Sequence, residues 1–230
     1  MRTYSAGLAI AAAALALGAQ AGHAQGGSAN PCSASNGASC IAGSPQLTEI
    51  SKPEPLQSSA YIAQIGDGNS ATVTQDSTRQ FARIVQNGDS SSVGATQSGD
   101  GTAYLEIDQA GLLNTIVVRQ SADLGGGNIA LVAQQGAGNV IGLDQSGIAG
   151  SVNTAMLAQQ GSGNQMQLGQ DGADNRAELV QLGDNNAMTA TQNGSANQLR
   201  WVQNGSGLSD LQIVQTGGQA ISITQSNGGS

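Results

Sequence analysis

Aromatic and charged residues are scarce in this 230-residue chain, at 2% and 10%. So few large and charged side chains argue against an ordinary globular core. Basic residues are scarcer still, with seven Lys and Arg against fifteen Asp and Glu. Nucleic-acid binding needs clusters of basic side chains along a phosphate track, so the composition argues against it. The acidity is better suited to keeping the chain soluble and slowing premature association.

The chain has one histidine, His23, and this scarcity excludes most enzyme chemistry. Schemes that use histidine as a base have no residue to perform them, and a metal site lacks its commonest ligand. Glycine-rich stretches such as 125–127 and 161–163 lack the lysine and helix of a phosphate loop. The carboxylates Glu106 and Asp108 are expected on a solvent face, as solubilising charge. We therefore expect no enzyme activity and no cofactor.

No apolar run is long enough for a membrane span of about 20 residues. The N-terminus instead has the pattern of a signal peptide, with Arg2 followed by an uncharged run over 6–18. Small residues allow cleavage after Ala24, or alternatively after Ala21. Residues 1–24 are thus predicted to be a signal peptide, and the mature protein is predicted to be exported with a net charge of −9, from six basic and fifteen acidic side chains.

Proline and cysteine are confined to residues 25–57, which contain all four prolines and both cysteines. This stretch has no sequence period and is predicted to be a flexible leader. Cys32 and Cys40 would form an intrachain disulfide closing a short loop in an oxidising compartment. Export in reduced form and an intermolecular bridge are the alternatives. Residues 226–230 form a short polar tail.

Glutamine, in contrast, recurs with a period of almost always eleven residues. The fifteen glutamines in phase are Gln64, Gln75, Gln86, Gln97, Gln109, Gln120, Gln134, Gln145, Gln159, Gln170, Gln181, Gln192, Gln203, Gln215 and Gln225. Every residue two or four positions before them is apolar, from Ala60 and Ile62 to Ile221 and Ile223. Disorder would not keep thirty apolar residues in phase, so the period predicts an ordered repeat.

The repeat is interpreted as a β-strand, because side chains of a strand alternate between two faces. The glutamine, the two apolar positions and the position six before the glutamine then point the same way. That sixth position is asparagine in nine units: Asn69, Asn114, Asn128, Asn139, Asn153, Asn164, Asn175, Asn186 and Asn197. Intervening residues such as Ser70, Thr72 and Thr74 should face solvent. Glycine two positions after most glutamines supplies the positive φ of a tight turn.

Strand and turn together fill one eleven-residue step, so successive strands must lie in different sheets. Residues 58–225 are therefore predicted to form an all-β solenoid of two facing sheets with about 22 residues per coil. Two steps are fourteen residues long, and their extra residues should lie in turns at 122–127 and 147–151. Insertions confined to one edge are what a solenoid tolerates.

Stacked coils place each Gln above another Gln, and most Asn above Asn, so amide ladders are expected along the solenoid. An unpaired buried amide costs about 1–3 kcal/mol, and the ladder therefore also fixes the register. The ends lack a recognisable cap, although a soluble solenoid needs one. Unpaired strand edges are templates for another chain, so polymerisation is the expected outcome.

These residues resemble the curlin repeat, approximately Ser-x5-Gln-x-Gly-x2-Asn-x-Ala-x3-Gln. Ser58, Gln64, Gly66, Asn69, Ala71 and Gln75 reproduce the motif, and Gln170, Gly172, Asn175, Ala177 and Gln181 match its second part. The motif's serine is lost elsewhere, and Ser91 and Ser209 stand where Asn is expected. The resemblance covers residues 58–225, nearly all of the mature chain.

The resemblance to the curlin family implies a subunit of curli, an amyloid fimbrium or pilus on the surface of bacteria. Such subunits leave unfolded through an outer-membrane secretion channel with accessory factors. They polymerise outside, with a partner curlin subunit, into fibres for adhesion, aggregation and biofilm matrix. By analogy, residues 25–57 would target the channel. The family has major and minor, nucleating subunits, and the apolar rows resemble the minor type slightly more.

Two other interpretations compete with a fibre. Asp67, Asp100, Asp171 and Asp184 in glycine-rich turns suggest a calcium solenoid, but that class has a nine-residue period. These aspartates are instead interpreted as gatekeepers, which are charged residues that weaken the aggregation of individual repeats. The second rival is a soluble solenoid acting as a surface adhesin or binding module that does not polymerise.

Two groups of large side chains have a structural explanation. Trp201, in a buried row, is expected to fill the core. Ile129, Leu131 and Ala133 make the outer face of one strand apolar and would form either a lateral contact between fibres or a scattered patch.

Overall fold

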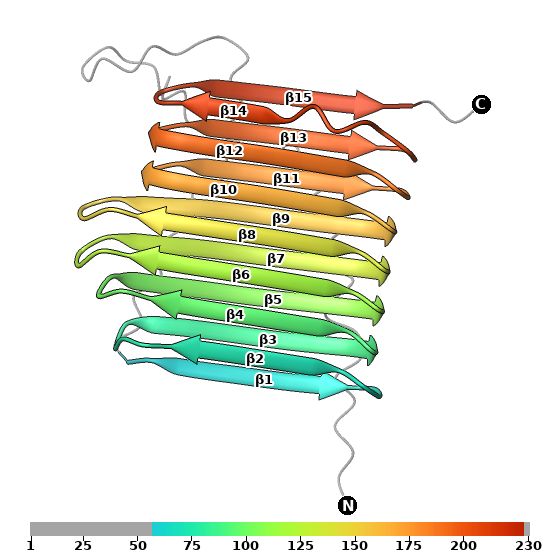
Figure 1. Ribbon diagram of the computed structural model, residues 1–230, viewed down its shortest axis with the longest axis horizontal. Coiled ribbons are helices and arrows are strands. Elements are labelled where there is room, and N and C mark those ends of the chain that lie inside the picture. Colours follow the sequence, from blue (N-terminus) through green and yellow to red (C-terminus); the bar gives the residue numbers. More distant parts are fainter. Residues whose placement is uncertain (1–56, 228–230) are drawn as a thin grey trace, which may run out of the picture. The chain divides into compact units, whose positions relative to one another are not determined.

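The computed structural model describes residues 57–227, which form a β-solenoid of about seven coils without a helix (Figure 1). The predicted signal peptide, nearly all of the leader, Cys32, Cys40 and residues 228–230 lie outside the described part. The fifteen strands are β1 (Ser59–Ile65), β2 (Ser70–Gln75), β3 (Gln80–Asp89), β4 (Ser92–Ser98), β5 (Thr102–Leu112), β6 (Thr115–Ala122), β7 (Gly127–Ala137), β8 (Val140–Gly147), β9 (Val152–Ser162), β10 (Gln165–Ala173), β11 (Arg176–Leu182), β12 (Ala187–Ser195), β13 (Gln198–Asn204), β14 (Ile213–Thr216) and β15 (Ala220–Ser226).

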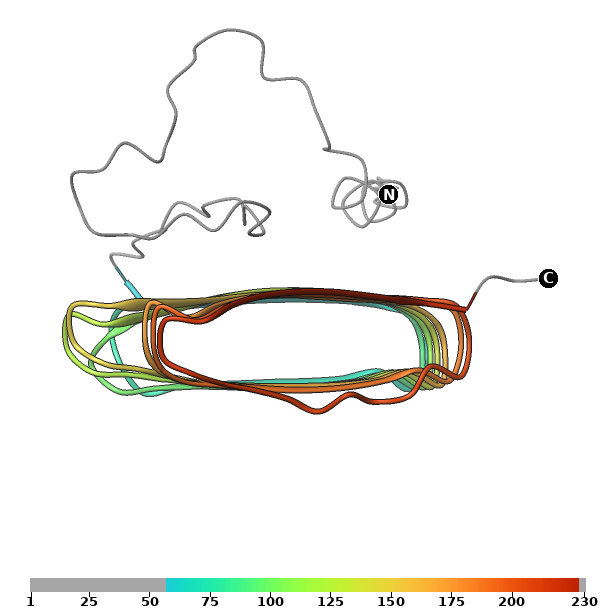
Figure 2. The ribbon, with the colours of Figure 1, turned by 90° about the horizontal axis from the view of Figure 1, so that it is seen from above.

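Odd-numbered and even-numbered strands form two separate parallel sheets. The eight-stranded sheet has the order β1-β3-β5-β7-β9-β11-β13-β15, and the seven-stranded sheet has the order β14-β12-β10-β8-β6-β4-β2. Seen from above, the sheets are the long sides of a flattened oval (Figure 2). Each glutamine is paired with the glutamine one coil further on, as Gln64 with Gln86 and Gln109 with Gln134. The predicted all-β solenoid is thereby confirmed, with coils of 22, 23 or 25 residues.

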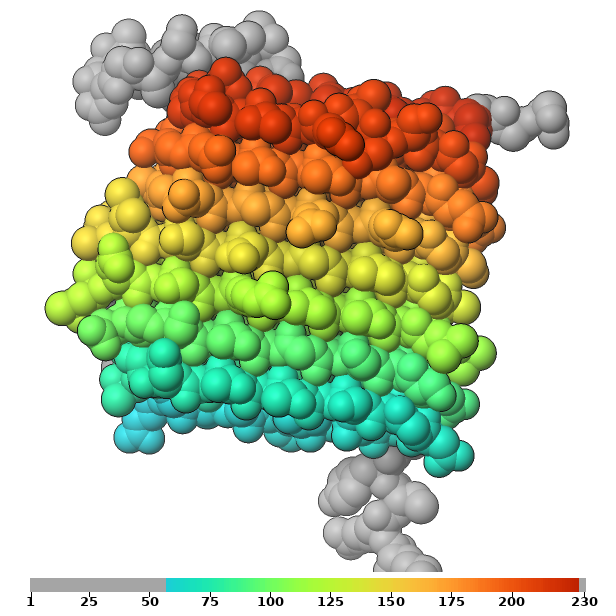
Figure 3. Space-filling view, viewed as in Figure 1, coloured from blue at the N-terminus to red at the C-terminus, as the bar shows by residue number. Residues whose placement is uncertain are grey.

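The core is the thin layer between the two sheets. It contains alternate residues of each strand, such as Ala82 and Ile84 on β3 and Ile116 and Val118 on β6. The residues between them lie on the outer faces, where Thr72 and Thr74 of β2 are exposed. This alternation is what a period of two requires of a strand covered on one side only. The stacked rungs form continuous bands across the molecule (Figure 3).

One residue of the predicted apolar rows points outward. Leu211, four positions before Gln215, is 49% exposed. Strands of facing sheets run in opposite directions, so its position faces the row that contains Trp201, a fully buried residue. An additional residue before Gln215 lets the chain bow out of the seven-stranded sheet, as the C-terminal part of Figure 2 shows, and β14 keeps only four residues.

The turns lie along two edges, and the insertions that the sequence predicts lie at one of them. The additional residues of the longer coils lie between β6 and β7 and between β8 and β9, as the sequence predicts. Both turns are on the same edge, where the loops in Figure 2 extend to different distances. The other edge is regular as far as β12. A column of positive-φ glycines follows this edge: Gly66, Gly88, Gly111, Gly136, Gly161, Gly183 and Gly205.

Gly136 shows why this column excludes side chains. Its φ is +120°, and a Cβ atom would lie 1.8 Å from the carbonyl oxygen of Gly161 in the next coil. Gly142, in the middle of β8, has no atom within 3.7 Å of its would-be Cβ, the nearest being Gln167 Cδ at 3.8 Å. The first glycine is therefore required by the stacking of coils, whereas the second tolerates a side chain.

We expect Gly136→Ala to lower the free energy of unfolding by at least about 1–3 kcal/mol, because it adds strain at a left-handed residue and a clash between coils. Gly142→Ala is the matched control and should change stability by no more than about 1 kcal/mol. Chemical denaturation of the two purified variants, followed by circular dichroism, measures both values. Equal stability of the two variants would contradict the close approach of coils at Gly136.

Candidate functional site

The fifteen glutamines form two columns of hydrogen-bonded side chains, one inside each sheet. In every pair, Nε2 donates to Oε1 of the glutamine one coil nearer the C-terminus. The seven bonds of the eight-stranded sheet and the six of the seven-stranded sheet have lengths of 2.7–2.9 Å. Every donor thus points toward the C-terminal end, which gives both ladders the same direction.

The second amide hydrogen of many glutamines crosses to the facing sheet. Gln97 Nε2 donates to the Phe81 carbonyl at 2.9 Å, and Gln192 Nε2 donates to the Arg176 carbonyl at 2.9 Å. Away from the terminal coils the glutamines are buried, and no buried side-chain nitrogen or oxygen in residues 57–227 lacks a partner. A glutamine therefore links its own sheet along the solenoid and also ties the two sheets together.

The asparagines also form columns, but they bond mainly to the backbone. Asn139 is typical, since its Nδ2 donates to the Gly161 carbonyl at 2.7 Å, and its Oδ1 accepts the backbone N–H of Asn164 at 3.0 Å. Direct amide–amide contacts are fewer, such as Asn197 Nδ2 to Asn175 Oδ1 at 2.9 Å. In place of the expected Asn ladder, the asparagines mainly hydrogen-bond the backbone of the turn in the next coil. We call this pair of backbone bonds the asparagine clamp. Sequence reasoning missed this role, although glycine three residues before most asparagines was its signal.

Ser91 stands in the column where the repeat has asparagine. It is buried, and its hydroxyl accepts the backbone N–H of Asn114 at 3.2 Å. The hydroxyl also donates to the backbone carbonyl of Asp89 at 3.3 Å. The serine thus reproduces part of the clamp with a shorter side chain.

The N-terminal end of the solenoid exposes its core and unpaired acceptors. Ala60 and Ile62, on the inner side of β1, are exposed, and Ile62 retains 41% of its accessible surface. Among residues 57–227, no donor reaches Oε1 of Gln64 or of Gln75. The first coil therefore ends in two free amide oxygens beside an open apolar core.

The C-terminal end presents a donor. Gln225 Nε2 donates to the Ser209 carbonyl at 3.2 Å, and the described chain offers no partner for its other hydrogen. Gln215 uses both hydrogens, on the carbonyls of Gln198 and Gln219. Next to β14, Asp210 accepts the backbone N–H of Thr189 at 2.9 Å and its hydroxyl hydrogen at 2.6 Å. This carboxylate covers part of the free edge of β12.

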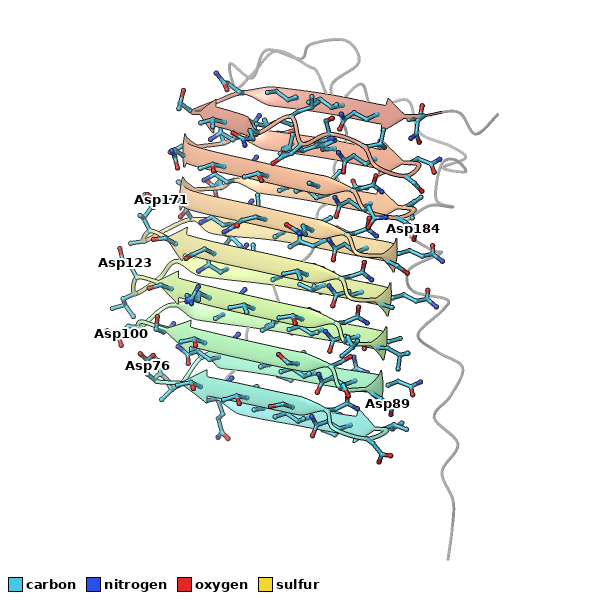
Figure 4. The ribbon with its side chains drawn as sticks, turned by 45° about the vertical axis from the view of Figure 1, so that its right-hand side comes forward. Asp76, Asp89, Asp100, Asp123, Asp171 and Asp184 are labelled. Atoms are coloured by element: carbon cyan, nitrogen blue, oxygen red, sulfur yellow. The ribbon has the colours of Figure 1, made fainter. Side chains whose placement is uncertain are left out.

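The turn aspartates lie on both edges, so they do not form one calcium-binding column. Figure 4 shows Asp89 and Asp184 at one edge and Asp76, Asp100, Asp123 and Asp171 at the other. Asp89 Oδ1 accepts the backbone N–H of Asp67, and Asp184 Oδ1 accepts that of Ser162, both at 2.7 Å. No group of three acidic, histidine or cysteine side chains that could hold a metal ion occurs in the described range.

The outer face of the eight-stranded sheet carries stacked and paired side chains. Phe81 and Tyr104 stack with ring centroids 4.9 Å apart. Ile129 continues their column and is only 2% exposed, whereas Leu131 and Ala133 are half-buried.

The two carboxylates expected as free solubilising charge on this face are engaged. Glu106 accepts a hydrogen bond from the Tyr104 hydroxyl, and Asp108 pairs with Arg83 at 3.1 Å. Both carboxylates are half-buried rather than fully exposed.

Comparisons of the chain with protein-family models, curated proteins and solved structures found no match. Within residues 57–227, the structure contains no helix with the length and apolar character needed to cross a membrane.

A glutamine inside the ladder should be far more important for stability than its exposed neighbour. Gln134→Ala removes the acceptor of Gln109 and the donor to Gln159, and leaves two buried amide groups unpaired. At about 1–3 kcal/mol for each group, we expect a loss of about 2–6 kcal/mol in unfolding free energy. Gln135→Ala, at an exposed position of the same strand, should change it by about 0.5 kcal/mol or less. Denaturant titrations of both variants measure their unfolding free energies. Similar losses of unfolding free energy in the two variants would contradict the role of the glutamine ladder.

The stack on the outer face predicts a dependence on alkaline pH. Burial, together with the hydrogen bond to Glu106, raises the pKa of Tyr104 from its ordinary 10.0 to about 12. Above pH 10 the unfolded chain loses this proton before the folded chain does, so stability should fall as pH rises from 10 toward 12. Tyr104→Phe keeps the ring and should lose less stability over this range. An identical pH profile for the two proteins would show that Tyr104 is not the group responsible.

Proposed function

We propose that this protein is a structural subunit of an extracellular, curli-like amyloid fibre. Copies add to one another at the open ends of the solenoid. The observation that carries the proposal is the state of these ends, where β1 exposes Ile62 and the ladders stop at free amide groups. An edge of this kind is a template for another strand of the same type. A second copy is the partner with the matching sequence of apolar and amide groups.

Addition of a copy repeats interactions that the chain already makes within itself. Each coil inside the solenoid gives its neighbour two glutamine bonds, asparagine clamps and buried apolar side chains. Each hydrogen bond contributes about 0.5–1.5 kcal/mol, and burial of apolar surface adds roughly 25 cal/mol per Å². A joint between copies would have the same chemistry as a joint between coils, which favours long polymers.

The wider role follows from the resemblance of the repeat to the curlin family. We propose that the subunit is exported, passes the outer membrane through a secretion channel and assembles outside the cell, with or without a partner curlin. The resulting fimbrium would mediate adhesion, aggregation and formation of the biofilm matrix. The outer faces suit this role because each copy presents them again along the fibre.

Incubation of the purified mature protein tests the proposal. We expect the sedimenting fraction and the fluorescence of an amyloid dye to rise together, and the fibres to diffract with a meridional spacing of about 4.8 Å. Persistent monomer by sedimentation, without dye-binding fibres, would overturn the proposal in favour of a soluble solenoid that acts as an adhesin.

A charge at the open end should block growth without unfolding the subunit. Ile62 and Tyr61 are adjacent on β1 and are 41% and 57% exposed, but only Ile62 lies on the inner side. Ile62→Lys would place an uncompensated charge in the joint, which costs several kcal/mol. It should raise the critical concentration for fibre formation at least tenfold, because about 1.4 kcal/mol corresponds to a factor of ten.

Tyr61→Lys is the matched control, since its lysine remains on the outer face in a fibre. Sedimentation of both variants at several concentrations gives the critical values. Equal values for Ile62→Lys and Tyr61→Lys would mean that growth does not use this end of the core.

A further inference from the structure

Residues 57–227 contain fifteen strands, and this odd number determines how a second copy can fit on the first. Both terminal strands, β1 and β15, belong to the eight-stranded sheet. Because successive strands alternate between sheets, β1 extends half a coil beyond β2 at one end, and β15 extends half a coil beyond β14 at the other (Figure 1). Each end of the solenoid therefore has a step, and both steps protrude on the same sheet.

Stacking two copies without rotation places one protruding strand on the other. Strand β1 of the second copy would then pair with β15, while β2 would remain separated from β14 by the width of one missing strand. Such a gap leaves backbone groups unpaired on both of its sides, which is unfavourable for buried structure. A straight joint consequently satisfies only one of the two sheets.

We propose that copies join end to end with each copy turned by half a turn about the solenoid axis. Strand β1 of the added copy then extends the seven-stranded sheet at β14, and β2 extends the eight-stranded sheet at β15. Protruding strands meet recessed ones, so neither sheet has a gap. The half turn also reverses the direction of β1, which makes it parallel to β14. This inference rests on the proposed function and specifies its interface.

The side chains at the two ends are complementary in this arrangement. Gln225 has an amide hydrogen to donate, and Oε1 of Gln75 in the added copy has no donor of its own. On the other sheet Gln215 lies below Gln64 of the added copy, and its bond to the Gln219 carbonyl would change to that ladder acceptor. Every ladder donor would again point toward the C-terminal end, as within one chain.

The apolar rows of the two copies continue through the same joint. With the glutamines in register, Val73 and Ala71 of the added copy lie over Ile223 and Ile221, which are partly buried at the free end. Ile62 lies over Ile213. The joint is regular along all of β15, whereas the bowed segment before β14 shortens the other contact to about the four residues Ile213–Thr216.

The joint requires a specific symmetry of the fibre. Seven and a half coils at roughly 4.8 Å each give a rise of about 36 Å per copy, with a rotation of about 180°. The stacked Phe81–Tyr104 face and the threonine-rich face of β2 and β4 would then alternate along each side of the fibre. A straight joint would keep each face on one side.

Two double-cysteine variants of the full chain distinguish the joints, both with Cys32→Ser and Cys40→Ser. In the half-turn joint Thr224 lies beside Thr74 of the next copy, whereas in a straight joint it lies beside Ala63. Neighbouring strands are about 4.8 Å apart, within the Cα separation that a disulfide spans. Thr224→Cys with Thr74→Cys is the first variant, and Thr224→Cys with Ala63→Cys is the matched second. Within one chain neither pair can bond, because β15 lies at the opposite end from β1 and β2.

Each variant is assembled under reducing conditions, oxidised and run on a non-reducing denaturing gel. We expect covalent dimers, trimers and longer oligomers from the first variant and monomers from the second. Oligomers from the second variant alone would overturn the half turn and leave the fibre proposal intact. Fibres of which neither variant becomes cross-linked would also overturn it. Failure of the parent chain to form fibres would instead refute the proposed function.

Discussion

The buried glutamine amide is the constraint on which the rest of this structure depends. A primary amide has two hydrogens and an oxygen, and all three need partners once the group is removed from water. Inside this solenoid the oxygen accepts from the glutamine of the preceding coil, and one hydrogen is donated to that of the following coil. Where the second hydrogen reaches a carbonyl of the facing sheet, as at Gln97 and Gln192, the amide also sets the thickness of the core. Asparagine, the other primary amide of the inner rows, bonds mainly to the backbone of the turns instead.

This constraint explains which parts of the coil vary and which do not. The inner rows accept many apolar residues, from Ala130 to Trp201, because packing in a thin layer tolerates exchange of volume between neighbours. The amides and the column of turn glycines do not vary in this way. Asn139 needs the carbonyl of Gly161, and that carbonyl lies where a Cβ of Gly136 would be. Asparagine and glycine on this edge therefore depend on each other, and the two insertions of the fourteen-residue steps lie at the opposite edge.

Much of this arrangement could be predicted from the sequence, because residues that recur with the period of the repeat occupy equivalent positions in successive strands. The two sheets, the positions of the long turns and the alignment of glutamines all follow from it. The exposure of Leu211 could not be predicted, because the period does not show where the chain accommodates the additional residue between Gln203 and Gln215. The bonds of asparagine to the backbone were also missed. They depend on how close two turns lie, and a pattern of residue types does not contain that distance.

The repeating unit is one strand, and this has a consequence for assembly that a two-strand unit would not have. A chain with an even number of strands ends with its two steps on different sheets. A copy of it then fits without rotation. With fifteen strands both steps fall on one sheet, and the fit requires the half turn. Gain or loss of a single eleven-residue step would switch the symmetry of the polymer while leaving each coil unchanged. In this fold, the number of repeats determines the rotation between neighbouring copies. The residues within each repeat determine only that copies can join.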